Sequence, residues 1–228
     1  MPQVTVLTAI VILSSVVSGC VLGVAAQEAT PAALPIVGAT FVGATSDADA
    51  LVAVIVADPA PGTTQRAAQA YLCDGAAISV WFDQGGVEGN GIALTAADGE
   101  HLTGTLGPED ITGTIRIAEG EALAFEARPA TGLAGLYTAT VQADGRFRGA
   151  SMSGIWIAGT FVTEPAPDGS YAALATLTLP TGEEDTLPLQ VTTLEVTELL
   201  FIIAEDGRVA GADRHQGPGF VFNTAGDT

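Results

Sequence analysis

Lysine is absent from this chain of 228 residues, and arginine occurs only seven times. Aspartate and glutamate together number 26, so the formal net charge is -19 at pH 7. A surface this acidic repels nucleic acid phosphates and anionic lipid headgroups. We therefore expect no nucleic acid partner, and contact with a membrane only through an N-terminal anchor.

Cysteine and histidine are almost as scarce, with two residues of each. Cys20 lies in an apolar N-terminal segment, so cleavage or lipidation there leaves Cys73 without a disulfide partner. A nucleophilic Cys73 would need a neighbouring base and a lowered thiol pKa. His101 and His215 are the only histidines, and neither has a recognisable catalytic signature around it. The sequence therefore predicts that Cys73 is buried and unreactive.

Helical periodicity is also missing, whereas short alternating segments separated by turn signals recur at roughly ten-residue spacing. Hydrophobic residues make up 48% of the chain, with 28 glycines, which excludes a disordered protein. The pattern predicts an all-β fold of ten or more strands in one antiparallel β-meander domain, residues 40–222. A barrel is favoured over a sandwich because consecutive strands are hairpin-linked. Five Asp-Gly pairs, which suit tight hairpins, begin at Asp74, Asp98, Asp144, Asp168 and Asp206.

Five segments carry more specific predictions. Residues 51–56 are continuously apolar, which predicts a strand covered on both faces. Residues 84–89 are glycine-rich and predict a loop; because a strand follows them, the helix N-terminus of a phosphate-binding loop is missing. Residues 103–105 and 112–114 both read Thr-Gly-Thr and predict paired hairpin strands. Residues 199–203 fit a helix or a strand by periodicity, and the Asp206-Gly207 turn after them favours a final hairpin.

The N-terminal segment predicts export. Residues 4–17 form an uncharged apolar run where the core of a signal peptide belongs. Three processing routes fit: lipidation of Cys20 after a lipobox of residues 17–20, ordinary cleavage after residues 24–26, or an uncleaved span. We assign residues 1–26 to a signal or anchor helix, residues 27–39 to a tether and residues 223–228 to a tail. The expected location is the bacterial cell envelope, by lipid anchor, or the medium.

Four landmarks occur in order along the chain: Tyr71-Leu72-Cys73-Asp74-Gly75, Trp81-Phe82, Gly135-Leu136-Tyr137 and Asp206-Gly207-Arg208. With these landmarks the chain resembles an uncharacterised group of exported bacterial all-β domains. The resemblance covers roughly residues 50–212, with residues 147–198 as additional sequence. It implies an extracytoplasmic β fold and transfers no catalytic residue, because the group has no assigned activity.

The expected function is a non-enzymatic, envelope-tethered binding or structural domain. A closed barrel can hold a small apolar ligand, and an envelope component is the alternative partner. Core packing explains the aromatic residues equally well. The aromatic side chains that could line a ligand site are Trp81, Phe82, Phe125, Tyr137 and Trp156.

Two further functions remain open. Acidic segments at Asp47 and Asp49, at Glu109 and Asp110, and at residues 183–185 could supply oxygen ligands to calcium, although none matches a known calcium loop. Solvated turns explain the same acidic residues. A hydrolase would need Asp83 with Glu88, or Glu126, to converge with a second acid across strands.

Overall fold

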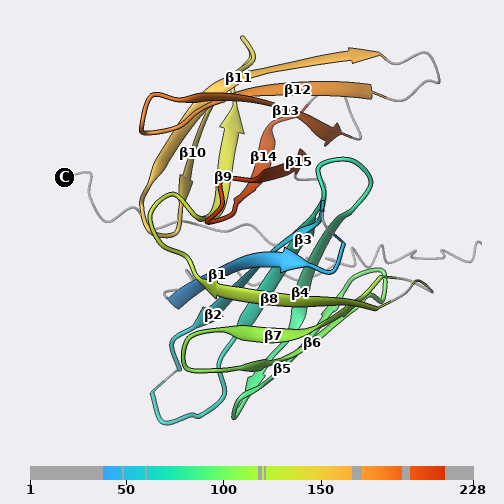
Figure 1. Ribbon diagram of the computed structural model, residues 1–228, viewed down its shortest axis with the longest axis vertical. Coiled ribbons are helices and arrows are strands. Elements are labelled where there is room, and N and C mark those ends of the chain that lie inside the picture. Colours follow the sequence, from blue (N-terminus) through green and yellow to red (C-terminus); the bar gives the residue numbers. More distant parts are fainter. Residues whose placement is uncertain are drawn as a thin grey trace, which may run out of the picture. The chain divides into compact units, whose positions relative to one another are not determined.

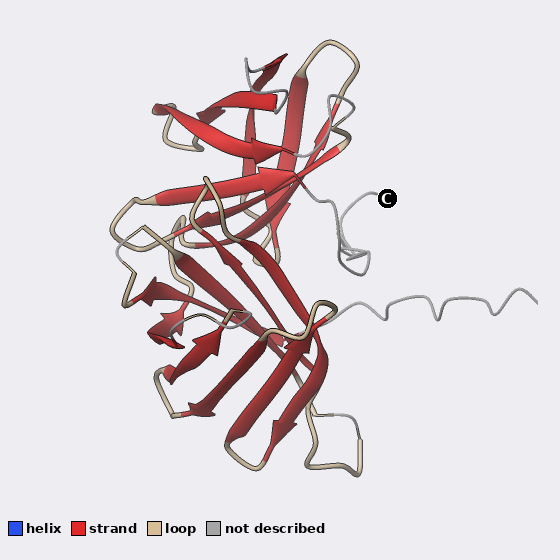
Figure 2. Ribbon diagram, turned by 90° about the vertical axis from the view of Figure 1, so that its right-hand side faces the viewer, coloured by secondary structure: helices blue, strands red, loops and turns tan. Residues whose placement is uncertain are grey.

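The computed structural model describes residues 38–213, apart from residues 48, 60, 118–119, 121, 166–170 and 192–195. These described residues form fifteen strands and no helix (Figure 2). Accordingly, no helix long and apolar enough to cross a membrane occurs among them. The segments predicted to be signal, lipidation site and tail lie outside the described residues.

The first eight strands form a closed antiparallel barrel, coloured blue to green in Figure 1. Each strand pairs with the next, and β8 returns to β1, where Gly43 lies opposite Ala127. The strands are β1 (Gly38–Thr45), β2 (Leu51–Ala57), β3 (Ala68–Cys73), β4 (Ser79–Glu88), β5 (Gly91–Ala96), β6 (His101–Leu106), β7 (Ile111–Arg116) and β8 (Ala122–Pro129).

The remaining seven strands form a second sheet, yellow to red in Figure 1, in the order β10-β11-β12-β13-β15-β14-β9. All neighbours are antiparallel except β13 and β15, which are parallel and joined by the single pair Gln190 and Ala212. This one pair completes the ring. The strands are β9 (Gly135–Val141), β10 (Arg146–Ser151), β11 (Trp156–Pro165), β12 (Tyr171–Thr178), β13 (Glu184–Val191), β14 (Glu198–Ile203) and β15 (Val209–Asp213).

The prediction of an all-β, antiparallel fold with a barrel is confirmed, but the strands divide into two sheets instead of one continuous meander. The strand order changes at β14, which pairs with β9 and not with β13. Five consecutive residues of β14, from Leu199 to Ile203, are buried, so this strand needs apolar cover on both faces. One face of β14 packs into the core of the second sheet, through residues such as Phe201, and the other face packs into a further apolar cluster, through residues such as Ile202.

Strand β2 is covered on both faces, as its continuous apolar run predicts. Val52 and Val54 face the interior of the first barrel, where they belong to its apolar core. Leu51 and Ile55 point the opposite way, into a third apolar cluster that also contains Ile202 of β14. Because successive strand residues point to opposite faces, one uninterrupted apolar run packs into both the barrel core and the third cluster.

The glycine-rich residues 84–89 differ from the predicted loop, because strand β4 continues through residue 88. The pairing of β4 with β5 shifts between Phe82 and Gln84, so Asp83 is bulged out of the ladder. Gly85 then takes a φ of 122°, which a residue with a side chain rarely adopts. Glycine here lets the strand bend and resume pairing, and the turn follows at Gly89 and Asn90.

The two Thr-Gly-Thr segments pair as predicted, with Gly104 opposite Gly113. Phe125 of the neighbouring strand β8 lies opposite Gly113 and is buried in the barrel. A Cβ atom on Gly113 would lie 2.8 Å from the Phe125 ring, and one on Gly104 would lie 3.5 Å from it. The ring therefore occupies the space that two missing side chains leave inside the barrel.

Candidate functional site

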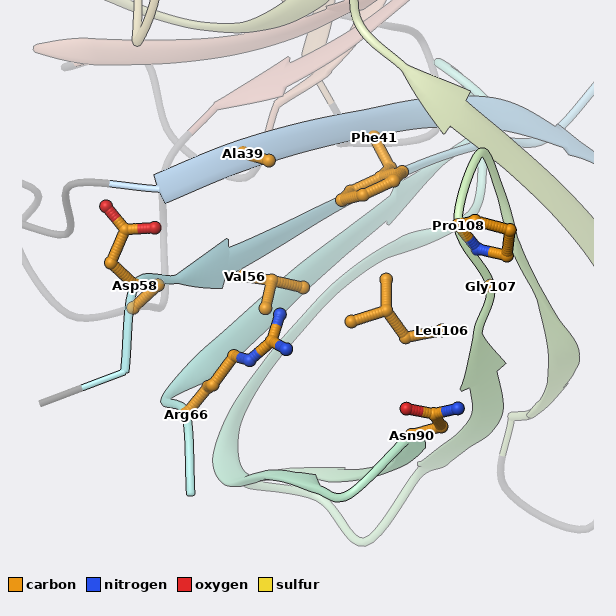
Figure 3. A pocket seen from close by; sticks show the side chains of 10 residues that line it. Ala39, Phe41, Val56, Asp58, Arg66, Asn90, Leu106, Gly107 and Pro108 are labelled. Atoms are coloured by element: carbon orange, nitrogen blue, oxygen red, sulfur yellow. The ribbon is translucent and has the colours of Figure 1, made fainter. Parts of the chain in front are cut away.

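One end of the first barrel carries an open pocket of about 450 Å³ (Figure 3). Antiparallel neighbours place the β2–β3, β4–β5 and β6–β7 connections at this end, where β1 also begins. The pocket volume is within the range of small-molecule sites. These connections and strand ends therefore enclose a space that a small molecule can enter.

Four side chains give part of the pocket an apolar wall. Phe41 and Val56 come from the inner faces of β1 and β2 and continue the barrel core to the opening. Leu106 at the end of β6 and Pro108 complete the wall on the other side (Figure 3). The backbone N–H of Leu106 donates to the carbonyl oxygen of Asn90 over 2.8 Å, which ties β6 to the β4–β5 turn. The pocket is thus an extension of a packed core.

Two opposite charges also line the pocket, Asp58 just after β2 and Arg66 just before β3. The backbone N–H of Ala57 donates to the carbonyl oxygen of Ala67 over 2.8 Å, which extends the β2–β3 ladder beyond the strands. Continuing this register by one position places Asp58 opposite Arg66. Both then fall on the inner face of the barrel, because side chains alternate along a strand.

The backbone of Arg66 is held in place by strand β4. Its N–H donates to the carbonyl oxygen of Val87 over 3.2 Å, and the N–H of Val87 donates back over 2.9 Å. The guanidinium group points into the pocket (Figure 3), while Asp58 is exposed at the rim. A fixed backbone with a free guanidinium head suits a group that receives an anion.

Arg66 and Asp58 differ from the ion-paired groups elsewhere in the described part of the chain. There, three arginines each bind a carboxylate two residues earlier: Arg128 with Glu126, Arg146 with Asp144, and Arg208 with Asp206. Neither Arg66 nor Asp58 has a side-chain hydrogen bond or ion pair to any described residue. The pocket therefore offers one unpaired cation and one unpaired anion.

The predicted aromatic residues do not meet in this pocket. Phe82 and Phe125 are buried in the core of the first barrel, and Tyr137 in that of the second sheet, where its hydroxyl donates to the carbonyl oxygen of Leu133 over 2.6 Å. Trp81 lies in the third cluster, with its ring centroid 5.6 Å from that of Tyr71. Trp156 is 57% exposed on β11. Among these five, four have the core-packing role that the sequence left as the alternative.

The sequence prediction missed Phe41, Val56, Arg66 and Leu106. None of them belongs to a motif; Phe41 lies within β1, whereas the other three lie at or near the end of a strand. The one available signal was the inner-face alternation of β1 and β2 continued into the following loop. Arg66, as one of only seven basic residues, would then have been noticed.

Four of the acidic residues considered for calcium lie in two turns at opposite ends of the first barrel, and residues 183–185 lie around the start of β13 in the second sheet. In the β1–β2 turn, a carboxylate oxygen of Asp47 accepts the backbone N–H of Asp49 over 3.3 Å. Glu109 and Asp110 lie between β6 and β7. No group of three or more metal-ligating side chains occurs among the described residues.

The carboxylates considered for hydrolysis are also dispersed. Asp83 sits at the bulge of β4, where one carboxylate oxygen is buried with no hydrogen-bond partner. Glu88 ends the same strand and is exposed. Glu126 is on β8, which does not neighbour β4, and binds Arg128 at 2.9 Å. The structure therefore does not join these acids into one site.

Cys73 is fully buried, as predicted. Burial raises the pKa of its thiol to about 11, against smaller lowering effects of hydrogen bonds from Tyr71 and from the backbone of Gly75. His101 is exposed on β6, where its Nδ1 lies 3.1 Å from the hydroxyl of Thr95. His215, like Cys20, lies outside the described residues.

Comparison of the chain with protein families, with curated proteins and with solved structures finds no match.

Proposed function

We propose that this protein is a non-enzymatic, extracytoplasmic domain, tethered to the cell envelope through Cys20, that binds a small molecule in the mouth of its first barrel. The observation that carries the proposal is the open pocket of about 450 Å³, whose lining combines apolar side chains with one unpaired cation and one unpaired anion. Apolar lining with few polar groups is the usual composition of a small-molecule site.

The barrel explains how such a pocket persists. Phe41, Val56 and Leu106 lie on β-strands held by ladders on both sides, so this part of the pocket exists before a ligand arrives. A preformed site avoids the entropic cost of ordering loops on binding. The polar groups at the mouth would orient the ligand, and Phe41, Val56 and Leu106 would bury its apolar part.

The test is to fill the pocket with a larger side chain and to measure whether a small molecule still co-purifies with the protein. Ala39 lines the pocket and is exposed, so Ala39→Trp places an indole in the opening at little cost to folding. Ala124→Trp is the matched control, because Ala124 is an equally exposed strand residue of β8 that does not line the pocket.

The full chain, extracted from envelopes and purified, is examined by native mass spectrometry for a co-purifying small molecule. We expect the parent protein and the control Ala124→Trp to carry the molecule. Ala39→Trp should have lost it. Equal retention in all three proteins, or no bound molecule in the parent together with no thermal stabilisation by any member of a metabolite panel, contradicts the proposal.

A further inference from the structure

The unpaired charges at the mouth of the first barrel indicate what kind of molecule the pocket accepts. Resting on the proposed function, we infer that the ligand is a small zwitterion of the apolar α-amino acid type, with its carboxylate on Arg66, its ammonium on Asp58 and its side chain against Phe41, Val56 and Leu106.

The backbone positions of the two charged residues favour this class. In the extended β2–β3 register, Asp58 and Arg66 are directly opposite, and residues opposite in an antiparallel pair have Cβ atoms roughly 4.5–5.5 Å apart. Both side chains therefore start from neighbouring backbone positions, so one small ligand that carries both charges can reach both of them. An α-amino acid carries its ammonium and carboxylate on a single carbon atom, which meets this condition.

A direct ion pair between Asp58 and Arg66 is the competing arrangement. Asp58 is exposed and Arg66 is half-buried, so solvent would screen such a pair and it would contribute little to stability. In the structure the two side chains are turned apart, with the guanidinium inside the pocket (Figure 3). A ligand that binds both charges therefore has no strong ion pair between Asp58 and Arg66 to break.

Long-range electrostatics distinguishes a zwitterion from a simple anion. The net charge of -19 creates a negative potential that opposes the approach of a net anion. A zwitterion has no net charge, so it escapes this repulsion and still offers a carboxylate to Arg66. The apolar wall then selects amino acids with an apolar side chain over glycine.

Calorimetric titration of the purified full chain tests the inference with four ligands: L-leucine, glycine, N-acetyl-L-leucine and L-leucinamide. N-acetyl-L-leucine keeps only the negative charge, and L-leucinamide keeps only the positive charge. We expect leucine to bind at least tenfold more tightly than each of the other three, which corresponds to about 1.4 kcal/mol.

Two variants assign the charges to residues. Asp58→Asn should weaken the binding of leucine but not that of N-acetyl-L-leucine, since the acetylated ligand has no ammonium for Asp58 to bind. Arg66→Gln should weaken the binding of leucine but not that of L-leucinamide, which has no carboxylate. Thermal melting checks that both variants fold, and the comparison of the four ligands on the parent protein does not depend on either variant.

The outcomes separate this inference from the proposed function. Equal affinity for leucine and either singly charged analogue overturns the zwitterion, as does failure of leucine to bind. If leucine fails but another small molecule is lost from Ala39→Trp and retained by Ala124→Trp, the pocket remains a binding site and only the ligand class is wrong.

Discussion

The thiol of Cys73 illustrates how one buried side chain can reveal its surroundings. It lies in the third apolar cluster, where the thiolate is poorly solvated, so its pKa of about 11 is set mainly by burial. In the Cys20→Ser variant, Cys73 is the only thiol. We expect a thiol reagent to label it within minutes in denaturant and far more slowly in buffer; fast labelling of the native protein would revive the nucleophile.

The same pKa shift predicts a dependence of stability on pH. An unfolded thiol titrates near 9.0 and the native one near 11, so the native state retains its proton in this interval. Stability should fall as pH rises from about 9 to about 11, by roughly 2–3 kcal/mol in total. Cys73→Ala should lack this component, so the difference between the two unfolding curves isolates it. Parallel curves would contradict the prediction.

Gly113 is a second position where one added atom should change the stability of the protein. A Cβ atom there would collide with the carbonyl oxygen of Thr103 and press on the ring of Phe125. We expect Gly113→Ala to destabilise the protein by about 1–3 kcal/mol, measured as a lower urea midpoint. Gly91→Ala is the control, because its new Cβ would meet only the carbonyl oxygen of Glu88 at 3.5 Å, and it should change stability little.

At the scale of elements, the tripeptide Asp-Gly-Arg closes two hairpins in the same way. Between β9 and β10, the carboxylate of Asp144 accepts the backbone N–H of Arg146 at 3.1 Å and its Nε–H at 2.7 Å. Between β14 and β15, Asp206 accepts the same groups of Arg208 at 3.1 and 2.8 Å. The intervening glycines have φ values of 78° and 84°. This geometry recurs because it depends on local sequence.

These hydrogen bonds lower the pKa of both aspartates. For Asp144 the guanidinium of Arg146 has the largest effect, and for Asp206 the backbone N–H of Arg208 does. The turns should therefore keep this stabilisation above about pH 4 and lose it as pH falls through the lowered pKa values. In an NMR titration, Arg146→Gln should raise the pKa of Asp144 and leave Asp206 unchanged, and Arg208→Gln should do the reverse. A common shift of both aspartates would argue against a local cause.

At the scale of the whole molecule, the predicted anchor would place the proposed binding site at the cell envelope. If Cys20 carries lipid, Cys20→Ala removes the attachment point of the acyl chains. The variant should then be released from the membrane fraction or fail to mature, because stable anchoring needs two acyl chains. Fractionation and the mass of the native N-terminal peptide measure this. A mature N-terminus at Gln27 in the medium would show ordinary secretion. The ligand would then be bound away from the envelope.

Much of the β architecture could be predicted locally. The run of residues 51–56 identified a strand with two buried faces, and the Asp-Gly pairs at Asp74, Asp98, Asp144 and Asp206 each place a glycine at positive φ. The fifth, at Asp168, lies outside the described residues. Residues 84–88 were misassigned, because a bulge at Asp83 and the positive φ of Gly85 allow a glycine-rich segment to remain a strand.

The sequence by itself determined the strands and hairpins, because side-chain alternation and turn preferences act between residues close in the chain. Only the tertiary structure decided that β8 closes on β1, that β14 joins β9, and which side chains surround the pocket. Phe41 and Leu106 lie far apart in sequence and meet only when the barrel closes. Asp58 and Arg66 face one space because the β2–β3 register continues past the strands, and such a register is set by long-range packing.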